Sequence, residues 1–151
     1  MSAPDIFKLY KKSYVSVRSS KEQKIPGNQT TTVVLDTVDL ISNDFKLNSD
    51  NSVSCEKDGI IVINCKAYMM SGHEADNNII LGIKKNETEV GRISERPQGN
   101  KTENISTNDI IVDVKAGDKI TMIYTNYIDK ETVIGHASNK LSQNVLTAFY
   151  L

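Results

Sequence analysis

Short apolar or alternating runs recur along the chain and are separated by Gly, Asn, Asp and Ser. Helical periodicity is nearly absent, and this pattern is typical of an all-β sandwich or barrel. We expect a single domain of about ten strands over residues 14–151. The predicted strands are Tyr14–Arg18, Thr31–Leu40, a short piece around Phe45 and Leu47, Val53–Cys55, Ile60–Met70, Ile79–Lys84, Thr88–Ser94, Ile110–Val114, Ile120–Thr125, Thr132–His136 and Val145–Leu151.

Turn residues predict where these strands reverse. Asp58–Gly59 is the Asp-Gly signal for a tight reversal into Ile60–Met70, the strongest strand pattern of the sequence. Ser71–Asn78 and Glu95–Asp109 are polar, and we expect them to form loops, with some extended structure at the end of the second.

Residues 1–13 differ from the rest of the chain. Behind Pro4, the apolar Ile6, Phe7 and Tyr10 predict a short helical or extended arm with one apolar side. Such a segment is too short to be stable alone, so we expect it to pack on a partner. Residues 1–24 hold six basic and two acidic side chains, which favours an acidic partner surface or a solvated tail.

Several runs are apolar on both faces, whereas a strand of an isolated sandwich has one wet face. Three of them are Ile79–Ile83, Ile120–Tyr124 and Val145–Leu151, and Ile60–Ile63 is a fourth. If the first three lie side by side in one sheet, that sheet exposes a larger apolar patch than monomers usually tolerate. Self-association would cover it. The predicted interface residues are Ile80, Ile123, Tyr124, Leu146 and Tyr150.

Four segments resemble the jelly rolls of the complement and tumour-necrosis-factor family. They are Val33–Val38, Asn43–Phe45, Val53–Val62, in which Gly59 opens the central strand, and Val114–Ile120, which holds an Ala-Gly-Asp turn. The closing apolar run to Leu151 is similar to the last strand of that family. The chain departs from the family in lacking a collagen-like stalk and in having no Pro shortly before Gly59.

The resemblance implies a two-sheet antiparallel jelly roll that forms a homotrimer, with the first, third, sixth and last strands facing the threefold axis. Similar heads occur in tail, baseplate and fibre proteins of phages that infect Gram-positive bacteria. By this resemblance Ile6, Phe7 and Tyr10 would anchor the head to other virion proteins.

Composition and motifs argue against several other classes. The 18 basic and 19 acidic residues give a net charge of −1, which makes nucleic acid an unexpected partner. No run approaches the roughly 20 apolar residues of a membrane span, and the first 20 residues lack the apolar core of a secretory signal. Phosphate-binding and nucleophile-elbow motifs are missing, and we predict no enzyme activity, no catalytic residue and no cofactor.

The remaining chemistry-bearing residues have structural interpretations. His73 and His136 are interpreted as surface histidines, and the oxygen-rich 73–78 segment as a polar loop in preference to a calcium site. Cys55 and Cys65 are interpreted as buried thiols, and an intrachain bridge stays an alternative.

We therefore expect a non-enzymatic homotrimeric binding head of a phage tail, baseplate or fibre, assembled in the host cytoplasm and carried on the virion. Its expected ligand is a bacterial surface glycan or polymer, and the sequence does not place the receptor contact. The alternatives are a structural decoration or assembly protein of the virion, and a secreted or cell-surface complement-like or cytokine-like ligand.

Overall fold

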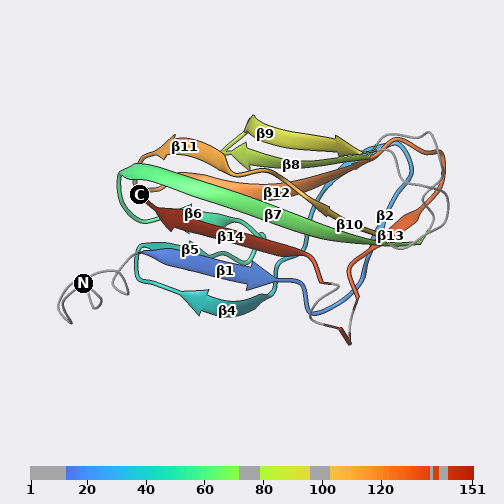
Figure 1. The fold of residues 1–151 in the computed structure, drawn as a ribbon, viewed down its shortest axis with the longest axis horizontal. Coiled ribbons are helices and arrows are strands. Elements are labelled where there is room, and N and C mark those ends of the chain that lie inside the picture. The colour runs from blue at the N-terminus through green and yellow to red at the C-terminus, as the bar shows by residue number, and fades with distance from the viewer. Residues whose placement is uncertain (1–12, 72–78, 96–102, 137, 140–142) are drawn as a thin grey trace.

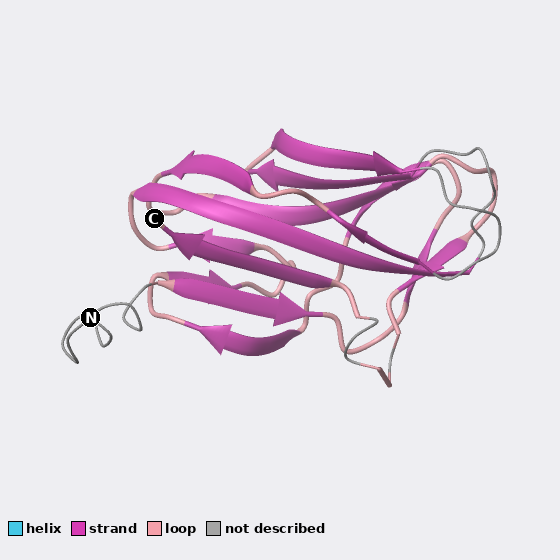
Figure 2. Ribbon diagram, viewed as in Figure 1, coloured by secondary structure: helices cyan, strands magenta, loops and turns pink. Residues whose placement is uncertain are grey.

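The computed structural model describes residues 13–71, 79–95, 103–136, 138–139 and 143–151. Every regular element within them is a β-strand, and the strands form two antiparallel sheets packed face to face (Figures 1 and 2). The predicted all-β, two-sheet antiparallel architecture is confirmed. Residues 1–12, which include Ile6, Phe7 and Tyr10 of the predicted arm, lie outside the described residues.

The larger sheet has eight strands, and β7 is its longest. β14 pairs with β7 on one side and with β1 on the other, and β4 follows β1 at the edge. β10 and β11 pair with the opposite side of β7, and β13 joins β2 to the far end of β7. The strands are β1 (Tyr14–Arg18), β2 (Gln23–Ile25), β4 (Thr37–Ile41), β7 (Gly59–Ser71), β10 (Glu103–Ser106), β11 (Ile110–Val114), β13 (Thr132–Ile134) and β14 (Val145–Tyr150).

The smaller sheet has six strands in the order β5-β6-β12-β8-β9, with β3 pairing with β12 beyond the end of β6. The strands are β3 (Gln29–Thr32), β5 (Phe45–Leu47), β6 (Val53–Cys55), β8 (Ile79–Lys85), β9 (Thr88–Glu95) and β12 (Lys119–Asn126).

The core fills the space between the two sheets. Alternate side chains of β1, β7, β12 and β14 point inward, as the period of two along a strand requires. Cys55 and Cys65 belong to this core as free, fully buried thiols, one in each sheet. Their interpretation as buried thiols is confirmed.

The predicted strand Thr31–Leu40 is wrong as one element. β3 ends at Thr32 in the smaller sheet and β4 begins at Thr37 in the larger one, so the chain changes sheets between them. Side-chain oxygens replace the backbone acceptors of a neighbouring strand there. The N–H of Val34 donates to Gln23 Oε1 at 2.9 Å, and the N–H of Leu35 donates to Asn51 Oδ1 at 3.2 Å. The alternating pattern therefore correctly indicated that Val33 and Leu35 are buried, but it did not indicate that the strand pairing is interrupted between β3 and β4.

The predicted reversal at Asp58–Gly59 is not a hairpin. β6 lies in the smaller sheet and β7 in the larger, so this turn carries the chain from one layer to the other. Asp58 Oδ1 also accepts the Ala116 N–H at 2.9 Å, which ties this corner to the turn between β11 and β12.

Candidate functional site

The outer face of the larger sheet carries a row of apolar side chains across four adjacent strands. Ile111 of β11 lies opposite Val62 of β7, Val62 lies opposite Phe149 of β14, and Phe149 lies opposite Tyr14 of β1. Directly opposite residues of antiparallel strands share a face and contact one another. Figure 1 shows β7, β14 and β1 side by side. The row is therefore continuous.

Most of this row is open to solvent in a single subunit. The exposed fractions are 68% for Ile111, 42% for Phe149 and 38% for Tyr14, while Val62 between them is 7% exposed. Ile60 and Leu151 extend the row, and the Leu151 N–H donates to Ile60 O at 2.9 Å. We call these side chains the outer apolar patch: Tyr14, Ile60, Val62, Ile111, Phe149 and Leu151.

A polar row borders the patch on the same face. Asn64 of β7 lies opposite Thr147 of β14, which lies opposite Ser16 of β1. The Asn64 side chain donates to Thr107 O at 3.0 Å. An apolar centre with a polar rim is the composition of surfaces that associate with another protein.

The inward side of β14 fixes the strand beneath the patch. Tyr150 points into the core, its hydroxyl donates to Lys57 O at 2.9 Å, and its ring centroid lies 5.0 Å from that of Phe45. Burial raises the pKa of the Tyr150 phenol above its ordinary value. Phe149, the residue before Tyr150, is consequently held on the outer face.

Charged side chains close this end of the sandwich. Ser13 donates its hydroxyl to Asp44 Oδ2, and the Lys57 ammonium lies 3.2 Å from the same carboxylate and 4.6 Å from the Tyr150 ring centroid. The hydrogen bond from Ser13 lowers the pKa of Asp44. This network joins Ser13, just before β1, to Tyr150 of β14, and the Tyr150 N–H also donates to Ser13 O at 3.0 Å.

The structure places the five interface residues predicted from the sequence elsewhere than on this patch. Tyr124, Leu146 and Tyr150 point into the core, and Ile80 and Ile123 lie on the outer face of the smaller sheet. Each is at most 8% exposed in one subunit, so these side chains offer little further surface to a second copy.

That prediction assumed that three apolar runs share one sheet, and this assumption is wrong. β8 and β12 pair with each other in the smaller sheet, but β14 lies in the larger one, so the three apolar runs do not share a sheet. Ile123 is covered within the subunit because it lies over Gly82, where a Cβ atom would come within 3.2 Å of Ile123 Cγ1. The runs that contribute to the patch are Ile60–Ile63 and Val145–Leu151.

The described part of the chain contains no group of three His, Cys, Asp or Glu side chains arranged to hold a metal ion. His73 and the rest of the 73–78 segment lie outside that part. His136 accepts the Ser138 N–H at 3.2 Å and meets the Tyr68 ring edge-on at 6.4 Å. Among the same residues, we find no helix with the length and apolar character needed to cross a membrane.

Comparison with known proteins gives a fold but no family. No protein-family model matches the chain. No curated protein matches it in sequence. Solved structures do match: murine APRIL is similar with a TM-score of 0.70 and 12% identity, over 93% of this chain and 100% of that chain. Eiger TNF from S. frugiperda is similar with a TM-score of 0.64 and 11% identity, over 93% of this chain and 91% of that chain. The fold is a TNF-like jelly roll.

Proposed function

We propose that this protein is a non-enzymatic binding head that assembles as a homotrimer through the outer apolar patch. The observation that carries the proposal is the row Ile111–Val62–Phe149–Tyr14, which crosses four strands and is mostly exposed in one subunit. Exposed contiguous apolar patches on soluble domains mark interaction surfaces. Likeness to TNF-like jelly rolls supports three as the number of copies.

A second apolar surface supports a cyclic assembly. β4 is the edge strand of the larger sheet, and its Val38, Leu40 and Ile41 side chains are exposed. A ring of three subunits joins two different surfaces of each subunit, head to tail. The patch and the β4 edge are two such surfaces on one sheet.

Light scattering with size-exclusion chromatography tests the assembly. We expect a mass of about 50 kDa, three times the 16.8 kDa chain. The double variant Ile111→Lys/Phe149→Lys should be monomeric, because two buried ammonium groups would face an apolar seam. The matched control Tyr127→Lys changes another exposed apolar side chain outside the patch and should stay trimeric. A monodisperse wild-type monomer at micromolar concentration would overturn the proposal.

For the biological setting we propose a virion tail, baseplate or fibre component that contacts the host surface. The support is the resemblance of the sequence segments to complement and tumour-necrosis-factor jelly rolls, a type of head that also occurs in phage tail, baseplate and fibre proteins. Antibodies raised against the protein should label intact virions and block their adsorption to host cells. Labelling without an effect on adsorption would favour the structural role.

A cytokine-like ligand is the second candidate, and the fold likeness to Eiger TNF favours it. Saturable binding of the purified trimer to animal cells, with no labelling of virions, would decide for this candidate.

A further inference from the structure

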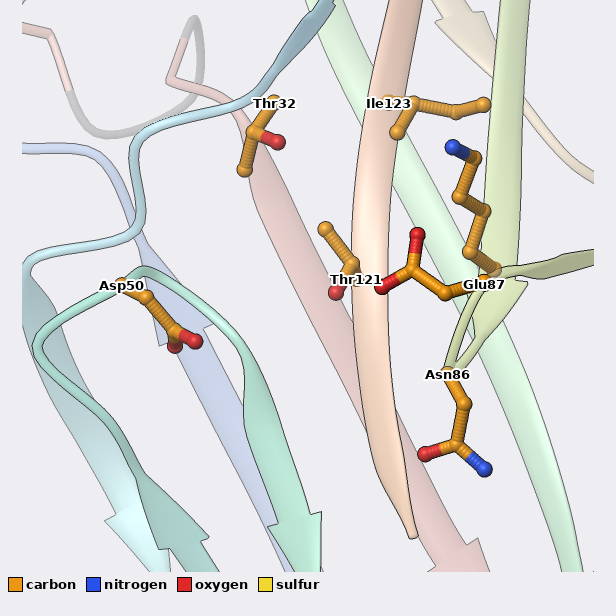
Figure 3. A pocket seen from close by; sticks show the side chains of 7 residues that line it. Thr32, Asp50, Asn86, Glu87, Thr121 and Ile123 are labelled. Carbon is orange, nitrogen blue, oxygen red and sulfur yellow. The ribbon is translucent and has the colours of Figure 1, made fainter.

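A polar pocket of about 240 Å³ opens on the outer face of the smaller sheet (Figure 3). The outer apolar patch lies on the larger sheet, on the opposite side of the sandwich. β12 forms its floor with Thr121 and Ile123, and Thr32 of β3 lies opposite Ile123. Ile123 packs over Gly82, which has no side chain, and it is the one apolar residue that lines the pocket. Ile123 is only 6% exposed, so the pocket is lined mainly by polar side chains.

Two turns form the walls of the pocket. Asp50 comes from the turn between β5 and β6, and Asn86 and Glu87 come from the turn between β8 and β9, on the other side of β12 (Figure 3). Lys119 ties both walls together, because its ammonium donates to Asp50 Oδ2 at 3.1 Å and its backbone N–H donates to Asn86 Oδ1 at 3.0 Å. The walls are thus held in place before any ligand arrives.

Hydrogen bonds within the protein keep Asp50 ionised and hold Asn86 in its turn conformation. The Ser52 hydroxyl and N–H donate to Asp50 Oδ1 at 2.5 and 3.1 Å, and these bonds, with that from Lys119, lower the pKa of Asp50 to about 2. Asn86 adopts a positive φ of 53°, and its side-chain amide donates to Asp118 Oδ1 at 3.0 Å. Asn tolerates this left-handed conformation in a turn.

Lys84 and Glu87 are the free polar groups of the pocket. Among the described residues, neither side chain makes an ion pair or a hydrogen bond, and the same holds for the Thr121 hydroxyl. Lys84 lies opposite Thr121 in the β8–β12 ladder. The pocket thus offers an ammonium donor, a carboxylate acceptor and a hydroxyl that the fold itself does not use.

We propose that this pocket binds one neutral sugar ring of a glycan. Its volume lies below the roughly 300–1,000 Å³ of sites for larger ligands, which suits a single ring. Sugar hydroxyls can donate to Glu87 and accept from Lys84, and hydrogen bonds to charged groups are the stronger ones.

The charge balance separates a neutral sugar from an anion. Two carboxylates, Asp50 and Glu87, stand against two ammonium groups, Lys84 and Lys119, so the site has no excess positive charge for phosphate or a polyanion. The sugar site rests on the proposed trimer in one respect only. A trimer would present three such pockets away from the subunit interface, and this raises the avidity for a repeating polymer.

Saturation-transfer NMR and calorimetry with the full-length protein test the site. The probes are the methyl glycosides of glucose, galactose, mannose, rhamnose and N-acetylglucosamine, with glycerol phosphate as the anionic comparison. We expect binding of at least one neutral glycoside with a dissociation constant of about 1 mM. Lys84→Met and Glu87→Gln should each weaken that binding about tenfold, since each removes one charge-assisted hydrogen bond.

Lys24→Met is the matched control, because Lys24 is an exposed lysine on β2 of the other sheet. It should bind as the wild type does, and all three variants should keep the wild-type mass and melting temperature. Absence of transfer to every neutral glycoside, or preference for glycerol phosphate, overturns the sugar site and leaves the trimer intact. A monomer that binds a glycoside overturns the trimer and leaves the site intact.

Discussion

The ring of Tyr150, on the last strand, lies directly over the α-carbon of Gly59, the residue that opens β7. A Cβ atom at position 59 would come within 2.9 Å of Tyr150 Cδ1 and 3.1 Å of Cε1. The Tyr150 hydroxyl reaches past Gly59 to Lys57 O. Only glycine leaves room for this ring, and the ring in turn fixes the strand that carries Phe149 on the outer apolar patch.

Gly59→Ala should therefore destabilise the fold by about 1–3 kcal/mol, the usual cost of overpacking a core. Urea unfolding at one fixed protein concentration measures the change. In a Tyr150→Leu background, which lacks the ring, the same substitution should cost less. An equal cost in both backgrounds would mean that the ring is not the reason for glycine at this position.

Asn126 is a fully buried amide that joins two loops. Its Nδ2 donates to Pro26 O at 3.2 Å and to Lys130 O at 2.9 Å, and its Oδ1 accepts the Ile128 N–H at 3.1 Å. Asn126→Asp should cost about 3 kcal/mol or more at pH 7, because a buried carboxylate would face carbonyl oxygens. Asn43→Asp, at an exposed site, should change stability little.

The pH dependence of Asn126→Asp has a definite sign. Burial would raise the pKa of the new carboxyl above its unfolded value, so the folded state holds its proton longer than the unfolded state does. The deficit relative to wild type should shrink as the pH falls from 7 toward 4. A deficit that is independent of pH would contradict a buried charge as its cause.

The two thiols should be unreactive in the native protein. Burial raises the pKa of Cys55 to about 11 and that of Cys65 above its ordinary value of 9.0, and both side chains are inaccessible. A thiol reagent at pH 8 should titrate neither cysteine in buffer and both in denaturant without reductant. Failure to titrate either thiol in denaturant would indicate a disulfide.

The same thiols predict a loss of stability at alkaline pH. Because the folded pKa of Cys55 is raised, its contribution is fully present below pH 9 and is lost as the pH rises toward about 11. The free energy of unfolding should fall by up to about 1.4 kcal/mol per pH unit for each such group. The fall should be less steep in Cys55→Ala, and an unchanged slope would rule out the thiol.

Alternation along the chain determined the strands. Ile60–Met70 and Ile110–Val114 were predicted from their own residues, and the structure has β7 and β11 there. The sequence also placed a turn at the Ala-Gly-Asp segment, and Gly117 of that segment takes a positive φ value in the structure. These features depend on neighbours in sequence, because the period of two and the turn preferences are local properties of the backbone.

The tertiary structure alone decided which layer each strand joins and which side chains stay exposed. Ile80 and Phe149 both stand on outward faces of apolar runs, yet Ile80 is covered within the subunit while Phe149 is 42% exposed. The alternation over Thr31–Leu40 did not predict that the chain changes sheets there. The sequence around Thr121 and Glu87 likewise did not predict a pocket. Periodicity records that a face is apolar, whereas what covers that face depends on strands paired from distant parts of the chain.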